Sequence, residues 1–306
     1  MRSTRDYLIL SCKGMMMGAA DAVPGVSGGT IAFITGIYEE LIDSIRQFNP
    51  EAVRILFREG PLSCWRHVNG NFLLALGLGI LASLLTLSHL MLYLLDTHPI
   101  MIWSFFFGLI LVSTWGVIRH VRGWDMNLVA AFVLGALLAY IITEQAPGNL
   151  EATGLTVFLA GTVAICAMIL PGISGSFILL LMGLYAPILS AIKGLEWSTL
   201  LLFMAGCVVG LLSFSRLLSW AFHHHRMLTL ALLGGFMLGS LNKIWPWKYT
   251  LAYTINSRGE EVPVLQQNLL PGSYEVLTGL SAGTWLALTL MLAGAALGIL
   301  LDRQKT

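Results

Sequence analysis

Two short motifs, 147 residues apart, carry small polar residues at the same spacing. They read PGVSGG at residues 24–29 and PGISGS at residues 171–176. Each is followed at the same distance by a Gly-aliphatic-Tyr sequence, GIY at 36–38 and GLY at 183–185. Serine hydroxyls and the accessible backbone N–H groups of glycine-rich turns donate hydrogen bonds to phosphate or carboxylate oxygens. The duplication therefore predicts two anion-binding tips.

We expect both tips to contribute to one anion site. The candidate ligands are Ser27, Gly28, Gly29 and Thr30 in the first tip and Ser174, Gly175 and Ser176 in the second. The arm at residues 30–45 is expected to be a helix whose N-terminus adds the positive end of its dipole. The alternative is that these small residues only let helices pack closely, as they do in membranes.

Three ionisable residues in apolar segments are further candidates, because such residues often mark functional sites in membranes. Asp21 precedes the first motif, and it either carries a proton or coupling cation or caps a helix end. Glu39 follows Tyr38 and either serves in coupling or faces cytoplasmic water. Arg216 either reaches the anion or extends to the membrane interface.

The composition shows which kind of protein must position these residues. Of 306 residues, 57% are hydrophobic and 11% are charged, with a mean hydropathy of +0.80. One packed core cannot bury so much apolar side chain, so lipid must cover the remainder. The net charge of +1 argues against a nucleic-acid partner. The four cysteines are scattered, so neither a metal site nor a disulfide framework is expected.

Six apolar stretches are expected to cross the membrane, at residues 72–95, 100–118, 128–143, 200–222, 228–244 and 280–301. Two further apolar segments, 15–45 and 155–192, are interrupted by Pro-Gly near their middles. In the second, each arm of about 15 residues reaches only about 22 Å, short of the roughly 30 Å hydrocarbon core. Both segments are therefore predicted to be re-entrant hairpins.

The distribution of positive charge supports the hairpin interpretation. With both hairpins returning to their starting side, thirteen of the seventeen Lys and Arg residues fall on one side of the membrane. Cytoplasmic loops carry this excess. Both termini are therefore expected to be cytoplasmic.

The duplicated motifs divide the chain into two repeats. Residues 1–150 contain the hairpin 15–45, a cytoplasmic segment 46–70 and three spans. Residues 151–306 contain the hairpin 155–192, three spans and an external loop 246–278. Three crossings per half invert the second repeat relative to the first. The expected fold is an all-α polytopic membrane protein with two inverted repeats, an architecture typical of secondary transporters.

The run MGAADAVPGVSGGT at 17–30, continuing to GIYE at 36–39, closely resembles the signature of the PopT family of bacterial inner-membrane proteins. LPGISGS at 170–176, and Gly239-Ser240 leading to Trp245-Pro246, resemble its later motifs. By this resemblance Asp21, Ser27, Gly28, Thr30 and Glu39 lie in the first signature, and residues 174–176 lie in the second.

The resemblance implies transport of undecaprenyl phosphate from the outer to the cytoplasmic leaflet of the inner membrane, for reuse in cell-envelope synthesis. It implies a transporter rather than an enzyme. The expected partners are this lipid, the surrounding membrane lipids and, as an open alternative, a second copy in a homodimer. No cofactor is expected, and a proton or sodium gradient is the candidate driving force.

Two other functions fit parts of the sequence. GVSG at 25–28 matches the G-x-S-G of rhomboid-type intramembrane serine proteases, with His89 as the candidate base. Glycine-rich helix ends also line anion channels. The occurrence of the serine motif twice, with no second equivalent histidine, favours the transporter over the protease.

Overall fold

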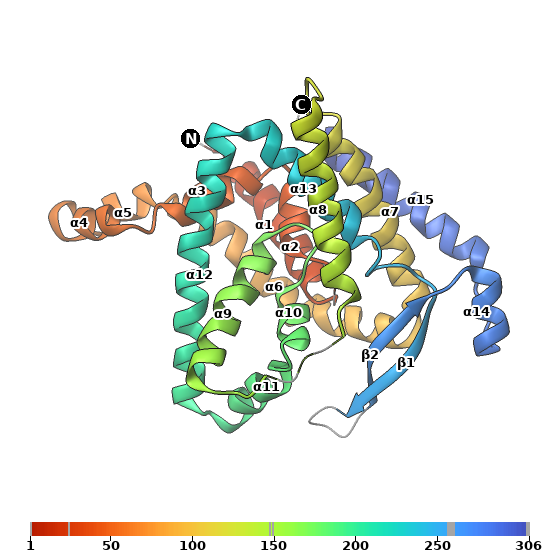
Figure 1. Cartoon of the computed structure of the whole chain (residues 1–306). Helices are drawn as coiled ribbons and strands as arrows, with labels where there is room; N and C mark the ends of the chain where they lie inside the picture. Colours follow the sequence, from red (N-terminus) through yellow and green to blue (C-terminus); the bar gives the residue numbers. More distant parts are fainter. Residues whose placement is uncertain (1, 24, 147, 149, 256–260, 304–306) are drawn as a thin grey trace.

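The computed structural model describes residues 2–23, 25–146, 148, 150–255 and 261–303 (Figure 1). Five of its helices are long and apolar enough to cross a bilayer. They are α6 (Gly70–Thr97), α7 (Pro99–Ile118), α8 (Met126–Glu144), α12 (Trp197–His224) and α15 (Thr284–Arg303). Four of them cover a predicted span in full, and α15 covers residues 284–301 of the span predicted at 280–301. The prediction of a multi-pass helical membrane protein is confirmed.

The span predicted at 228–244 is shorter than expected. Helix α13 (Arg226–Ser240) has 15 residues, a length of about 22 Å. After Ser240 the backbone tightens, because Lys243 N donates to the Ser240 carbonyl at 2.9 Å and Ile244 N donates to the Leu241 carbonyl at 3.2 Å. The helix therefore ends inside the fold, and residues 241–247 continue as non-helical chain.

The segment predicted as an external loop contains regular structure. Strands β1 (Lys248–Ile255) and β2 (Glu261–Asn268) form an antiparallel hairpin in which Lys248 lies opposite Asn268. Helix α14 (Pro271–Thr278) follows. The expectation of a purely helical protein is corrected by this hairpin, which the apolar spans gave no reason to predict.

Each predicted hairpin consists of three helices. The first contains α1 (Thr4–Asp21), α2 (Gly28–Ile34) and α3 (Tyr38–Arg46). The second contains α9 (Gly154–Ile169), α10 (Gly175–Leu181) and α11 (Tyr185–Gly194). The arm expected as one helix at 30–45 is therefore two short helices, and α10 and α11 are bent by 109°.

Glycines in the left-handed region make both breaks in each hairpin. The first break has φ values of +86° at Gly25 and +97° at Gly172. The second has +75° at Gly36 and +74° at Gly183. Only glycine adopts this backbone region at little cost. The paired values explain why the two motifs keep the same internal spacing.

Helix α1 begins at Thr4 rather than near residue 15, because its first half packs on another helix. Ser11 Oγ donates to the Ala75 carbonyl of α6 at 2.9 Å. Its Gly14 lies so close to Leu76 of α6 that a Cβ there would overlap backbone. This polar half lacks the hydropathy that marks the other helices, so it was not visible as part of the hairpin.

Four helix pairs make the most extensive contacts: α1 with α6, α9 with α12, α7 with α15, and α8 with α13. Reciprocal glycines allow the close approach. A Cβ at Gly108 of α7 would meet the Met291 carbonyl, and one at Gly294 of α15 would meet the Phe105 carbonyl. When the helices of the two halves are matched in chain order, the α1–α6 pair corresponds to the α9–α12 pair. The α7–α15 pair corresponds in the same way to the α13–α8 pair.

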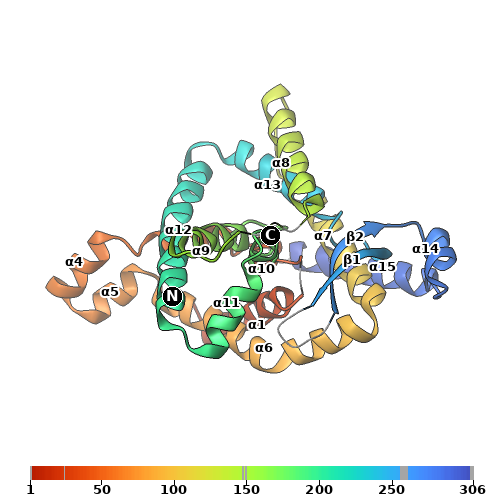
Figure 2. The same cartoon turned by 60° about the horizontal axis from the view of Figure 1, so that its bottom comes forward.

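The remaining helices α4 (Pro50–Glu59) and α5 (Pro61–His67) project from one edge of the molecule, while α14 lies at the opposite edge (Figure 2). The N and C marks lie at the same end of Figure 1, and α11 lies at the other end. The termini are thus separated from the β-hairpin side of the protein.

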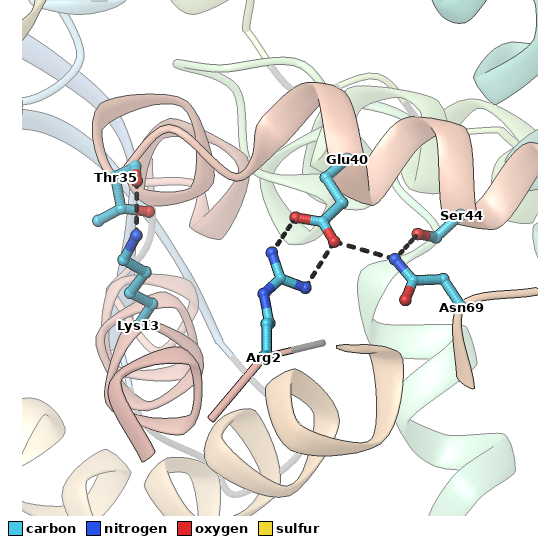
Figure 3. A network of polar contacts seen from close by, with 6 residues as sticks. All are labelled: Arg2, Lys13, Thr35, Glu40, Ser44 and Asn69. Atoms are coloured by element: carbon cyan, nitrogen blue, oxygen red, sulfur yellow. Dashed lines mark hydrogen bonds and ion pairs between the residues drawn. The ribbon is translucent and has the colours of Figure 1, made fainter. Parts of the chain in front are cut away.

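A polar network near the N-terminus attaches α1 and α6 to α3 (Figure 3). Arg2 donates to both oxygens of Glu40 at 2.6 and 2.5 Å, and Asn69 Nδ2 donates to Glu40 Oε1 at 2.9 Å. Lys13 Nζ donates to the Thr35 carbonyl at the end of α2, at 2.8 Å. This network fixes the returning arm of the first hairpin to the two helices beside it.

Candidate functional site

The tips of the two hairpins contact each other inside the protein. Ser27 Oγ donates to the Met168 carbonyl at 2.9 Å and to the Leu170 carbonyl at 3.3 Å. In the other direction, Gly172 N donates to Thr30 Oγ1 at 2.8 Å. Ser27 and Thr30 are fully buried. Residues 141 to 143 positions apart in the sequence thus meet at one point in the fold.

Within the first tip, the residues predicted to hold the anion bond to protein in this conformation. Gly28 N donates to Asp21 Oδ1 at 2.7 Å, and Gly29 N donates to Ser27 Oγ at 3.1 Å. A Cβ at Gly28 would lie 2.5 Å from Asp21 Oδ2. The small size of Gly28 therefore lets the carboxylate approach the backbone, and Asp21 acts here as an acceptor for a helix-end amide.

The serine side chains of the second tip make fewer hydrogen bonds to the rest of the described protein. Ser174 and Ser176 share a hydrogen bond of 2.7 Å between their hydroxyl oxygens, and Ser174 makes no side-chain cap on α10. Ser174 is buried, whereas Ser176 is exposed. In the described part of the chain these hydroxyls bond only to each other, so the second tip can exchange this bond for an anion without losing a contact between the hairpins.

Two of the predicted residues lie away from the tips. Arg216 Nη2 donates to the Phe48 carbonyl at 3.4 Å. It lies on a largely apolar groove of about 1070 Å³ between α12, α6 and the α4–α5 arm. Glu39 pairs with Arg226 at 2.8 Å beside a polar cavity of about 280 Å³. The structure brings neither side chain to Ser27 or Ser174.

The geometry does not assemble a serine nucleophile at Ser27. Its hydroxyl donates to main-chain carbonyls, and none of its hydrogen bonds within the described residues involves a histidine. An activated nucleophile requires a base within hydrogen-bond reach. The described residues also contain no group of three or more His, Cys, Asp and Glu side chains placed to hold a metal ion.

Sequence reasoning missed one residue at the tips, Lys243. A Cβ at Gly25 would lie 3.0 Å from Lys243 Cγ, so the lysine stem passes over the first tip. Its ammonium nitrogen lies 4.4 Å from the ring centroid of Phe177, in the first turn of α10. Lys243 lies in the motif that runs from Gly239-Ser240 to Trp245-Pro246. In the sequence its positive charge indicated only on which side of the membrane this segment lies.

Replacing the two tip serines by alanine is expected to have different effects on stability. Ser27→Ala removes the N-cap of α2 and both bonds to the second hairpin, so we expect the free energy of unfolding to fall by about 1–3 kcal/mol. Ser174→Ala removes one hydroxyl pair, and less than about 1 kcal/mol should be lost. Denaturant unfolding of both variants in the same detergent measures the difference. Equal losses would contradict the inter-hairpin role of Ser27.

Both variants are also expected to bind a phosphate head more weakly than the unmodified protein. A lipid-competition assay on folded Ser174→Ala is the cleaner test, because stability is nearly unchanged. Unaltered binding by this variant would remove the Ser174 hydroxyl from the anion site.

Comparison with known proteins identifies relatives across most of the chain. A family model described as undecaprenyl phosphate translocase-like matches residues 17–262. The chain is 53% identical over 300 residues to a polyprenyl-phosphate transporter of Vibrio cholerae, covering 98% of this chain and 97% of that protein. It is 33% identical over 258 residues to a polyprenyl-phosphate transporter of Staphylococcus aureus, covering 76% and 84%. No solved structure matches the chain.

Proposed function

This chain belongs to the undecaprenyl phosphate translocase-like family, and from that premise we propose that it carries undecaprenyl phosphate from the outer to the cytoplasmic leaflet of the bacterial inner membrane. Its relatives are named polyprenyl-phosphate transporters. The returned lipid would be reused as a carrier for cell-envelope polymers. The observation that carries this proposal is the direct contact between the two hairpin tips.

The physical problem for such a transporter is the lipid head. A phosphate entering hydrocarbon loses its hydration at great cost, while the isoprenoid tail needs no shelter. A pathway therefore has to enclose only the head, and the tail can stay in lipid. Hydroxyl and amide groups on non-helical backbone inside the membrane provide such an enclosure, since irregular backbone at this depth has to face protein or a cavity.

Alternating access would follow from the two repeats. The pairing of α1 with α6 corresponds to that of α9 with α12, and the pairing of α7 with α15 corresponds to that of α13 with α8. This correspondence supports an inverted repeat in which one half rocks against the other. The hydrogen bonds of Ser27 and Thr30 to the second hairpin then belong to one state. In the other state their donors, the Ser27 hydroxyl and the Gly172 amide, turn to the phosphate oxygens.

Within this scheme the residues have separate roles. The second tip, Ser174 to Ser176, accepts the phosphate first because, within the described residues, its hydroxyls bond only to each other. Residues 27–30 close over the head as the repeats move. Asp21 carries the coupling proton or cation, and its carboxylate also holds the Gly28 amide. Glu39 and Arg226 form an ion pair whose opening would accompany release on the cytoplasmic side.

The proposed orientation has both termini in the cytoplasm, with the α4–α5 arm on the same side. The exposed apolar side chains of the arm include Val53, Leu56, Phe57 and Trp65, and Arg54, Arg58 and Arg66 lie in the same segment. Such an amphipathic segment suits the membrane interface. Chemistry on the lipid is no part of the proposal, and the protein acts as a transporter rather than an enzyme.

Leaflet-resolved transport in proteoliposomes tests this function. Purified protein is reconstituted with undecaprenyl phosphate in the outer leaflet, and the lipid remaining there is measured over time under an imposed proton or sodium gradient. We expect protein-dependent loss that responds to one of the gradients. Chloride currents in planar bilayers that polyprenyl phosphate does not affect, together with no lipid movement, would favour an anion channel instead.

A further inference from the structure

Two lysines near the tips have no acidic partner within the described residues. Lys243 and Lys248 lie in and just beyond the non-helical segment after α13, and both are half-buried. Neither forms an ion pair with a carboxylate in the part of the chain that the structure describes. Both ammonium groups lie near aromatic rings: Lys243 Nζ is 4.4 Å from the ring centroid of Phe177, and Lys248 Nζ is 5.9 Å from that of Trp103.

The carboxylate of Glu144 acts electrostatically on both lysines but bonds to another group. Glu144, at the end of α8, accepts a hydrogen bond from Asn242 Nδ2 at 2.5 Å. Asn242 is held in turn by Asn268 Nδ2, which donates to its carbonyl at 2.8 Å and to its Oδ1 at 2.7 Å. Glu144 thus bonds to an amide network, and within the described residues neither ammonium group has a carboxylate as its direct hydrogen-bond acceptor.

The two lysines also influence each other. Burial, and then the nearby charge of Lys243, lower the pKa of Lys248 to about 7, although Glu144 acts in the opposite direction. Two half-buried cations that repel each other are unfavourable in the absence of an anion. A shared anion between them would remove this repulsion.

From this geometry we infer that Lys243 and Lys248 form a two-lysine site that takes the doubly charged head of a phosphate monoester as it enters from the side of the β-hairpin. The inference rests on the proposed function. It adds that the substrate site prefers a head with two negative charges over a head with one. A phosphate monoester carries a charge of about −1.5 to −2 near neutral pH, which matches two ammonium groups. A phosphodiester carries a single charge and matches them less well.

The location of the lysines suits entry toward the tips. The stem of Lys243 passes over Gly25 of the first tip, and its ammonium group lies beside α10, whose first turn carries the exposed Ser176. Lys248 begins β1 and reaches Trp103 near the start of α7. A head held by Lys243 would therefore lie beside α10, the helix that carries Ser176, and from there it would pass to the second tip.

The test uses farnesyl phosphate, a short monoester, and measures its binding to the full-length protein in detergent by tryptophan fluorescence. We expect Lys243→Gln and Lys248→Gln each to weaken binding at least tenfold. Lys193→Gln, which removes a lysine from α11 on the same side, is the matched control and should bind normally. A phosphodiester probe, dihexanoyl phosphatidylglycerol, should bind the unmodified protein more weakly than the monoester.

The pH dependence provides a second readout that a structural role would not give. Lys248 with a pKa of about 7 is protonated below that pH and loses its charge above it. The affinity for the monoester should therefore fall about tenfold between pH 6.5 and 8, by linkage. Lys248→Arg keeps its charge throughout and should bind at pH 8 nearly as well as at pH 6.5. The groups facing Lys248 that enter this titration are Lys243 and Glu144.

The outcomes separate this inference from the function on which it rests. If the unmodified protein binds farnesyl phosphate and both glutamine variants, folded by size-exclusion chromatography, bind it equally well, the two-lysine site is overturned and the transporter stands. If the unmodified protein binds no monoester and moves no undecaprenyl phosphate, both are overturned.

Discussion

Gly172→Ala is expected to reduce lipid transport about a hundredfold while leaving the protein in the membrane. Gly172 has φ of +97°, which costs an L-residue about 1–2 kcal/mol. Its new Cβ would lie 2.6 Å from Ser240 Oγ and 2.9 Å from Ser240 Cβ, an overlap that adds about 1–3 kcal/mol. The Gly172 amide also donates to Thr30, so a shift of this residue separates the two tips. A total near 3 kcal/mol corresponds to about two powers of ten.

A double variant separates the steric part of this effect from the backbone part. Gly172→Ala combined with Ser240→Gly removes both contacts with the Ser240 side chain but keeps the positive φ and the Phe236 carbonyl oxygen 3.2 Å from the new Cβ, and we expect it to recover about tenfold in transport. Gly77→Ala on α6 is the control, because nothing lies within 4 Å of a Cβ there. The measurement is the initial rate in proteoliposomes at equal protein content. A fully active Gly172→Ala variant would mean that contact between the tips is not needed.

Asp21 is the second position where a large effect is expected, and two substitutions distinguish its roles. Asp21→Asn keeps an oxygen that can accept from Gly28 N, whereas Asp21→Ala leaves this buried amide without its acceptor. An orphaned amide costs about 1–3 kcal/mol. We therefore expect Asp21→Ala to lose both stability and transport. Asp21→Asn should fold and bind farnesyl phosphate but lose transport driven by the gradient.

The comparison requires transport with and without the gradient for each variant. Asparagine cannot exchange a proton or carry the negative charge that attracts a cation, so only the coupled component should disappear. Gradient-driven transport that Asp21→Asn leaves intact would show that Asp21 is a helix-end acceptor alone. The coupling group would then have to be sought elsewhere, and Glu39 is the next candidate.

The sequence predicts those features of the fold that depend on local pattern. Hydropathy located the five long helices, because each has to be apolar along its whole length. The duplicated Pro-Gly motifs located the first break of each hairpin, where the positive φ of Gly25 and Gly172 favours glycine. The second breaks, at Gly36 and Gly183, were not predicted, although both glycines lie in the duplicated Gly-aliphatic-Tyr motifs. Pro24 lies outside the described residues, so its part in the first break stays a prediction.

Features that depend on tertiary contacts were not predictable in this way. Helix α13 was expected to continue through residue 244, and it ends where Ser240 meets Gly172 of the second tip. Lys243 and Lys248 could not be identified as site candidates from the sequence, because the residues beside them, Phe177 and Trp103, are distant in the chain. Arg216 was a candidate for the anion by charge, yet the fold directs it to the α4–α5 groove, where it donates to the Phe48 carbonyl.

The two tips also differ in a way that equal motifs did not indicate. Ser27 of the first tip bonds across to Met168 and Leu170, while Ser174 of the second bonds only to Ser176 among the described residues. In the alternating-access cycle that we propose, the two halves need not present equal surfaces in one state. The sequence records the similarity of the repeats, and the conformation determines which tip is free.

A cryo-electron microscopy map of the protein in lipid nanodiscs with undecaprenyl phosphate tests the central claim most directly. The account predicts phosphate density between the two hairpins, with an oxygen about 3 Å from the Ser174 or Ser176 hydroxyl, a hydrogen-bonding distance. Phosphate density in the groove beside Arg216, with the two tips joined to each other and carrying no density between them, would contradict it.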